Sequence, residues 1–175
     1  MRRALVGLLG VAIAVAALGG LMFALASREN AEVAAPSRAP GEEQPDLGAR
    51  HLPAGEHVPL ENLTDPPTSG PHHPQPVERD RATLDPNEIL HALELGNVIL
   101  FYEPGAPPRA LQAAQRELTG AFDPELAAAG QAVILAPREG AGRVTAAAWR
   151  RLARDVSPQA ARAFAEYWLG RGAAG

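Results

Sequence analysis

The chain has 175 residues, a formal net charge of −4 and no cysteine. It has no lysine, and all 16 of its Lys and Arg positions are arginine. Without cysteine it can form neither disulfides nor thiolate metal sites, and without lysine it has no Schiff-base amine and no P-loop phosphate ligand. Its acidic balance and the lack of a basic run argue against nucleic acid as a partner. The length allows one modest domain with accessory segments.

An uncharged apolar segment occupies residues 4–26. As a helix it would be about 35 Å long, enough to cross a hydrocarbon core of about 30 Å. Arg2 and Arg3 should hold the short N-terminal end in the cytoplasm, so the remainder would lie outside it. We therefore expect a single-pass protein of the cell membrane. A signal peptide cleaved after Ala24-Leu25-Ala26, which would leave a secreted domain, is the alternative.

Composition divides the chain into three parts. Residues 1–26 form the expected anchor or signal segment. Residues 27–50 are rich in Ala, Pro and Glu and poor in large apolar side chains, so they are predicted to be a disordered linker. An extracytoplasmic globular domain is expected over residues 51–175.

The first part of this domain should be irregular, because prolines from residue 51 to about 83 exclude long helices and central strands. A helix then begins with Asp85 as N-cap and Pro86 as its first residue, and ends at Gly96. His91 lies on this helix, on the face nearly opposite its apolar stripe.

The rest of the domain alternates strands and helices. Apolar runs predict buried strands at 97–102 and 132–136, and a helix is predicted over 107–119. Residues 143–149 permit either a helix or a strand, and we assign a strand. A last helix follows Ser157. The predicted fold is α+β, a small mixed sheet of about three strands with packed helices after a long proline-rich segment.

A rigid loop before the first helix carries the most informative residues: Pro66, Pro67, Thr68, Ser69, Gly70, Pro71, His72 and His73. Its prolines fix the backbone, which would place imidazoles before a metal ion arrives. We expect a metal cluster of His57, His72 and His91, with His73 or Glu94. Nitrogen donors favour copper(II) or zinc, and the lack of cysteine excludes a soft copper(I) site of the sulfur type.

Two other interpretations stay open. In the first, the histidines are structural, the loop packs over Leu95, and the domain is a metal-free structural or protein-interaction module. In the second, Ser69 is a hydrolase nucleophile with His72 or His91 as base and Glu94 orienting it, although Thr-Ser-Gly-Pro is a turn signature. A non-enzymatic accessory module of the cell envelope, with the membrane and an envelope protein as partners, is what these residues favour.

Three strings of residues also carry a family resemblance: the Pro66 to His72 loop, Gly55-Glu56-His57-Val58 before it, and residues 91–98 after it. They resemble the bacterial and archaeal domain of unknown function 3105, over about Gly55 to Gly172. The resemblance implies an exported or membrane-anchored protein without an assigned activity. That family's helix usually reads His-x-Leu-Glu-His-Gly, whereas this chain has Leu95 at the second histidine, so one expected ligand is missing.

Overall fold

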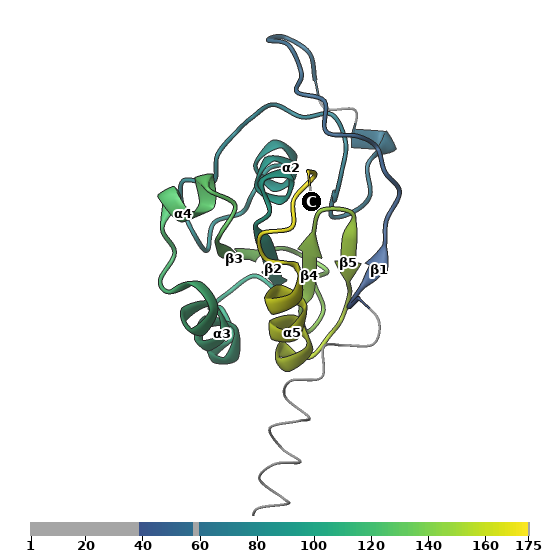
Figure 1. Ribbon diagram of the computed structural model, residues 1–175. Coiled ribbons are helices and arrows are strands. Elements are labelled where there is room, and N and C mark those ends of the chain that lie inside the picture. Colours follow the sequence, from purple (N-terminus) through teal and green to yellow (C-terminus); the bar gives the residue numbers. More distant parts are fainter. Residues whose placement is uncertain (1–38, 58–59, 175) are drawn as a thin grey trace, which may run out of the picture. The chain divides into compact units, whose positions relative to one another are not determined.

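The computed structural model describes residues 39–57 and 60–174, and one compact unit begins at Pro40 (Figure 1). The predicted anchor over residues 1–26 lies outside the described residues. Within residues 39–57 and 60–174, no helix has both the length and the apolar character needed to cross a bilayer. Residues 40–50, which the sequence assigned to the linker, differ from that expectation because they are part of the compact unit.

The described residues form an α+β fold on one mixed sheet, as predicted, but the sheet has five strands rather than about three. The spatial order is β1-β5-β4-β2-β3; only β2 and β3 pair in parallel, and the other neighbours are antiparallel. The strands are β1 (Glu42–Glu43), β2 (Val98–Tyr102), β3 (Val133–Pro137), β4 (Thr145–Ala148) and β5 (Arg151–Ala153).

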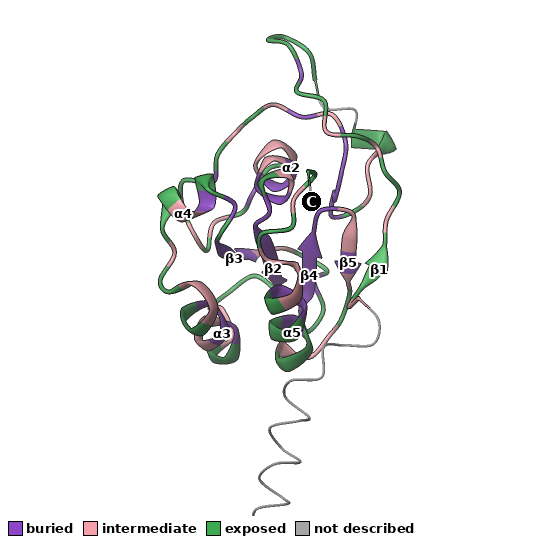
Figure 2. Ribbon diagram, in the orientation of Figure 1, coloured by how far each residue is buried: buried purple, intermediate pink, exposed green. Residues whose placement is uncertain are grey.

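Helices cover both faces of this sheet. They are α2 (Pro86–Leu95), α3 (Arg109–Thr119), α4 (Pro124–Ala128) and α5 (Pro158–Trp168), with a short 3-10 helix, η1 (Leu60–Asn62). Alternate side chains of β2 point to opposite faces: Ile99 and Phe101 pack with α2, whereas Val98 and Leu100 pack with α3 and α5. The central strands are therefore buried on both sides, as Figure 2 shows.

Helix α2 begins and ends as its sequence predicted. The Asp85 carboxylate accepts from the amides of Asn87 and Glu88, and the Glu88 carboxylate accepts from the Asp85 amide at 2.9 Å, which completes a capping box. Gly96 ends the helix in the left-handed region, with φ 114°. The buried face of α2 packs on the sheet, so that His91 and Glu94 are only partly covered.

Asp85→Ala should lower the free energy of unfolding by about 1 kcal/mol, because two amides of the first turn lose their acceptor. Chemical denaturation of both proteins measures this difference. Glu78→Ala, an exposed change before the helix, is the control and should leave the midpoint unchanged. An Asp85→Ala midpoint equal to that of the parent would contradict the capping role.

The segment before α2 is irregular apart from η1, as predicted, and it is held by an extended N-terminal stretch. We call residues 40–52 the strap. The amide of Gln44 donates to the Arg150 carbonyl at 2.9 Å, and the Gly70 amide donates to the Gly48 carbonyl at 2.8 Å. The strap thus runs from the sheet edge to the proline-rich loop.

Candidate metal centre

Four side chains converge at the outer face of α2: His51, His72, His91 and Glu94. Each offers one donor atom, and these atoms all lie within 4.8 Å of one another. The Glu94 Oε2 atom is 3.0 Å from His51 Nε2, 3.1 Å from His72 Nε2 and 3.6 Å from His91 Nδ1. Three imidazoles therefore surround one carboxylate oxygen, which is a donor set that could hold a metal ion.

Helix α2 and the C-terminal segment position two of these side chains. His91 and Glu94 are three residues apart and so share one side of the helix. The Glu94 carbonyl accepts from the Ala173 amide at 2.9 Å, and a Cβ added at Gly172 would lie 2.0 Å from that same carbonyl oxygen. The last turn of α2 is thus pressed closely by the chain that follows α5.

The other two histidines are joined by backbone pairing between the strap and the loop. His51 and His72 form a parallel β-bridge. The Leu52 amide donates to the His72 carbonyl at 2.8 Å, and the His72 amide donates to the Arg50 carbonyl at 3.1 Å. This pairing brings the two imidazole rings to a centroid distance of 5.1 Å.

The hydrogen bonds of His72 determine which ring nitrogen faces the centre. Its side chain has no exposed surface, and its Nδ1 lies 3.0 Å from the Gly70 carbonyl oxygen. A carbonyl can only accept, so Nδ1 carries a proton. In neutral His72 the Nε2 lone pair then faces Glu94 Oε2, which is also an acceptor. A proton or a metal ion is needed between these two atoms.

The electrostatics of the cluster favour an ionised carboxylate and a neutral His91. Burial acts to raise the pKa of Glu94, but the hydrogen bond from His51 and the charges of the surrounding histidines bring that pKa below its ordinary value. Burial, with the charge of His72, lowers the pKa of His91. His91 Nδ1 is buried and has no hydrogen-bond partner within residues 39–57 and 60–174.

The cluster is most exposed to solvent at His51. The His51 side chain is 48% exposed, whereas those of His91 and Glu94 are 16% and 19% exposed. A metal ion held here would have solvent at the His51 side, where water or another ligand can complete its coordination.

Three of the predicted ligands are brought together, namely His72, His91 and Glu94, and two are placed elsewhere. His73 Nε2 lies 2.9 Å from the Glu56 carbonyl oxygen, and His57 shares a separate surface pocket with His73. Neighbours in an extended chain point to opposite sides, which explains why His72 and His73 separate.

His51 was missed, because it begins a segment without a pattern and its position depends on backbone pairing. The remaining signal in the sequence was that His51 directly precedes an apolar residue, Leu52, which the structure buries.

The predicted loop residues are buried, apart from Pro71 and His73, which are half-buried. The Ser69 hydroxyl donates to the Pro45 carbonyl at 2.8 Å and accepts from the Leu47 amide at 3.1 Å. At Gly70 the backbone has φ 137°, and a Cβ would lie 2.5 Å from a Leu63 methyl carbon. Ser69 therefore joins the strap to the loop, and Gly70 allows the two to pass closely.

Leu95 is 38% exposed and is not sealed by the loop. It borders a small cavity of about 120 Å³ together with His91 and with Pro76 and Val77 of the irregular segment. Position 95 thus lies near His91 but outside the four-residue cluster.

Comparison with known proteins identifies a family. A family model described as "Protein of unknown function (DUF3105)" matches residues 54–172, well over half of the chain. No curated protein and no solved structure matches it. His72, His91 and Glu94 lie within the matched residues, whereas His51 and the rest of the strap precede them. The chain therefore belongs to the DUF3105 family of proteins of unknown function.

Proposed function

We propose that this domain binds one divalent transition-metal ion through His51, His72, His91 and Glu94. The observation that carries the proposal is the buried His72 ring. Its Nδ1 is committed to the Gly70 carbonyl, and its Nε2 is directed at the Glu94 carboxylate. A histidine that donates one ring nitrogen to a carbonyl while the other binds the ion is the usual arrangement around protein-bound metals.

Zinc and copper(II) are the ions we propose. Three imidazole nitrogens and one carboxylate oxygen suit both, whereas magnesium and calcium prefer sites made only of oxygen. Four donors around one point match the tetrahedral preference of zinc. Copper(II) would instead take a tetragonal arrangement, with water entering beside His51.

The cellular role we propose is that of an accessory module of the cell envelope. The apolar residues 4–26 would tether the domain to the membrane, with the metal centre outside the cytoplasm. The partner would be another envelope protein, because nothing in the acidic chain favours nucleic acid.

A metal-free structural or interaction domain is the second candidate, and one observation favours it. Glu94 Oε2 lies within hydrogen-bond distance of both His51 and His72, so protonated histidines would form a closed polar network without any ion. The geometry favours a hydrolase less, because Ser69 is 1% exposed and both of its hydroxyl contacts are with the strap backbone.

Calorimetric titration of the full-length chain with zinc and copper(II) tests the proposal, with a mild detergent present because of residues 4–26. We expect one ion per chain, and binding that His91→Ala weakens because it removes a partly buried donor. Leu95→Ala alters the same helix outside the donor set and should bind as the parent does. Weak binding that is equal in all three proteins would instead favour the metal-free interpretation.

A further inference from the structure

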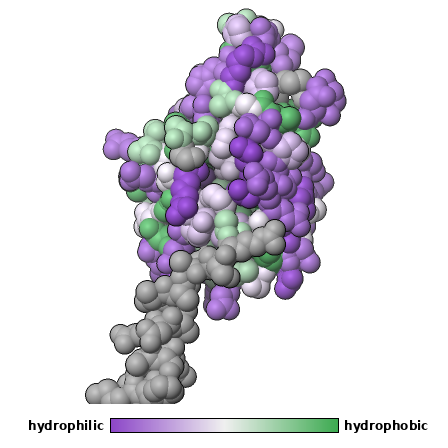
Figure 3. Space-filling view, turned by 45° about the vertical axis from the view of Figure 1, so that its right-hand side comes forward, coloured by the Kyte–Doolittle hydropathy of each residue, from purple (hydrophilic) through white to green (hydrophobic). Residues whose placement is uncertain are grey.

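The strap contributes His51 to the candidate centre and lies on the surface of the domain. None of residues 40–51 is buried, and Leu52 is the first buried residue of this segment. The face of the molecule that carries the strap is largely hydrophilic where it is visible in Figure 3. Residues 40–51 therefore bury little apolar side-chain surface of their own, and hydrogen bonds to Ser69, Gly70, His72 and Trp168 join them to the domain.

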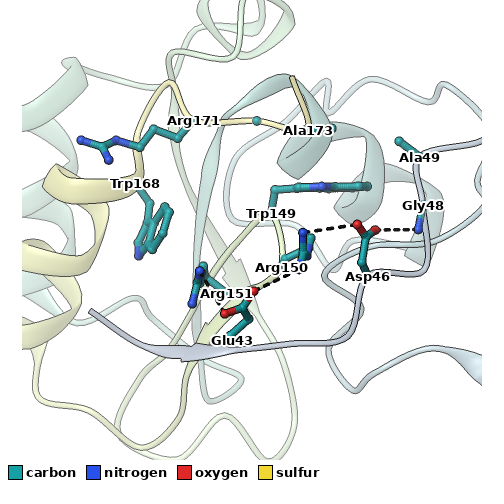
Figure 4. Close-up of a pocket in the computed structure, with 11 residues that line it drawn as sticks. Glu43, Asp46, Gly48, Ala49, Trp149, Arg150, Arg151, Trp168, Arg171 and Ala173 are labelled. Atoms are coloured by element: carbon teal, nitrogen blue, oxygen red, sulfur yellow. Dashed lines mark hydrogen bonds and ion pairs between the residues drawn. The ribbon is translucent and has the colours of Figure 1, made fainter. Parts of the chain in front are cut away.

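Ion pairs hold the strap to the turn between β4 and β5 and to the start of β5, as Figure 4 shows. Glu43 lies 3.0 Å from Arg150 and 3.4 Å from Arg151, and Asp46 lies 3.3 Å from Arg150. The two acidic side chains are 58% and 55% exposed, and exposed pairs of this kind contribute no more than about 1 kcal/mol each.

A cavity of about 390 Å³ lies between part of the strap and the domain. Four strap residues form one side of it, and Trp149 and Trp168 line it on the other (Figure 4). Where the strap borders this open cavity, it lacks the dense packing that rigidifies a segment.

His51 is the strap residue that reaches the candidate metal centre. We propose that a bound metal ion latches the strap onto the domain through His51, while His72, His91 and Glu94 hold the ion from the domain side. This rests on the proposed function. The latch works because the ion has four protein donors when the strap is docked and three when it is lifted, so binding shifts the population toward the docked state.

Release of the ion has a defined consequence for the surface. When the strap lifts, Arg150 and Arg151 lose Glu43 and Asp46, and the two tryptophans become more accessible. Metal occupancy would then control access to an arginine- and tryptophan-lined face of the domain.

Hydrogen exchange of the full-length chain in detergent, with and without saturating zinc, tests the latch. The amides to follow are Gln44, Leu52 and Gly70, whose acceptors lie across the seam between the strap and the domain. We expect zinc to slow their exchange roughly tenfold in the parent protein, a typical coupling between two sites. Val98, a sheet amide bonded to Ala132, is the internal control.

His51→Ala is the decisive variant. It should still bind zinc in the calorimeter, but more weakly than the parent. Because coupling is reciprocal, the fold-loss of zinc affinity should equal the factor by which zinc slows exchange of the strap amides in the parent. Zinc should not slow its strap amides. Zinc binding with unchanged strap exchange in the parent, or equal slowing in His51→Ala, would overturn the latch and leave metal binding standing. No zinc binding to the parent would overturn both proposals.

Discussion

Replacing His72 by alanine is expected to reduce zinc and copper(II) affinity by more than the roughly tenfold to hundredfold that loss of an outer-shell partner costs. His72 offers a donor atom itself, and its ring has no exposed surface, so water fills its place poorly. Competition with a chromophoric chelator measures the affinity. For copper(II), electron paramagnetic resonance should also report one fewer nitrogen ligand.

His73→Ala is the matched control for this change. The same residue type is removed one position along the chain, from a side chain bonded to the Glu56 carbonyl rather than to Glu94. Its metal affinity should equal that of the parent. Because His72 is buried, His72→Ala could affect folding as well, and circular dichroism must show that it is folded. A folded His72→Ala variant that binds metal as tightly as the parent would refute the proposed metal centre.

The affinity for zinc should fall steeply as the pH is lowered from 7 to 5. Imidazole binds a metal ion only when it is neutral, so each histidine that must lose a proton costs about tenfold in affinity per pH unit below its pKa. The lowered pKa of His91 keeps this ring neutral at pH values below 6.5, so His91 should contribute less to the decline than an imidazole of ordinary pKa would. Titrations at several pH values measure the slope, and an affinity independent of pH would exclude histidine ligands.

The metal-free protein provides the reference for that experiment. For His91 and Glu94 the pKa in the folded state lies below the ordinary values of 6.5 and 4.5, so the folded state binds fewer protons than the unfolded state. Their contributions to stability are complete above pH 6.5. The His91 contribution declines as the pH falls below 6.5, and that of Glu94 declines below 4.5. Denaturation in the presence of a chelator separates this acid effect from metal loss.

The elements with strong local signals were predictable from the sequence. The cap at Asp85 and the glycine at Gly96 mark the ends of α2, and continuous apolar runs mark β2 and β3. The assignment of residues 143–149 to a strand is confirmed by β4. What was missed is short: β1 has two residues, β5 has three and α4 has five, lengths over which no periodicity can develop.

The candidate centre was half predictable for a similar reason. The stiff loop indicated His72, and the helix indicated His91 and Glu94. His51 reaches them through hydrogen bonds of the backbone, which leave no side-chain pattern to read. The leucine at position 95 suggested that a ligand had been lost. The structure instead assembles four donors without that position.

Gly172 shows that substitutions outside the donor residues can disturb the candidate centre. The Glu94 carbonyl oxygen leaves no space for a methyl group there. Any side chain at this position, which is distant from Glu94 in the sequence, would push against the helical turn from which the Glu94 carboxylate projects. Mutations that disable the centre are thus not confined to residues that could touch an ion. The absence of a side chain at position 172 is as much a requirement of the centre as a donor atom.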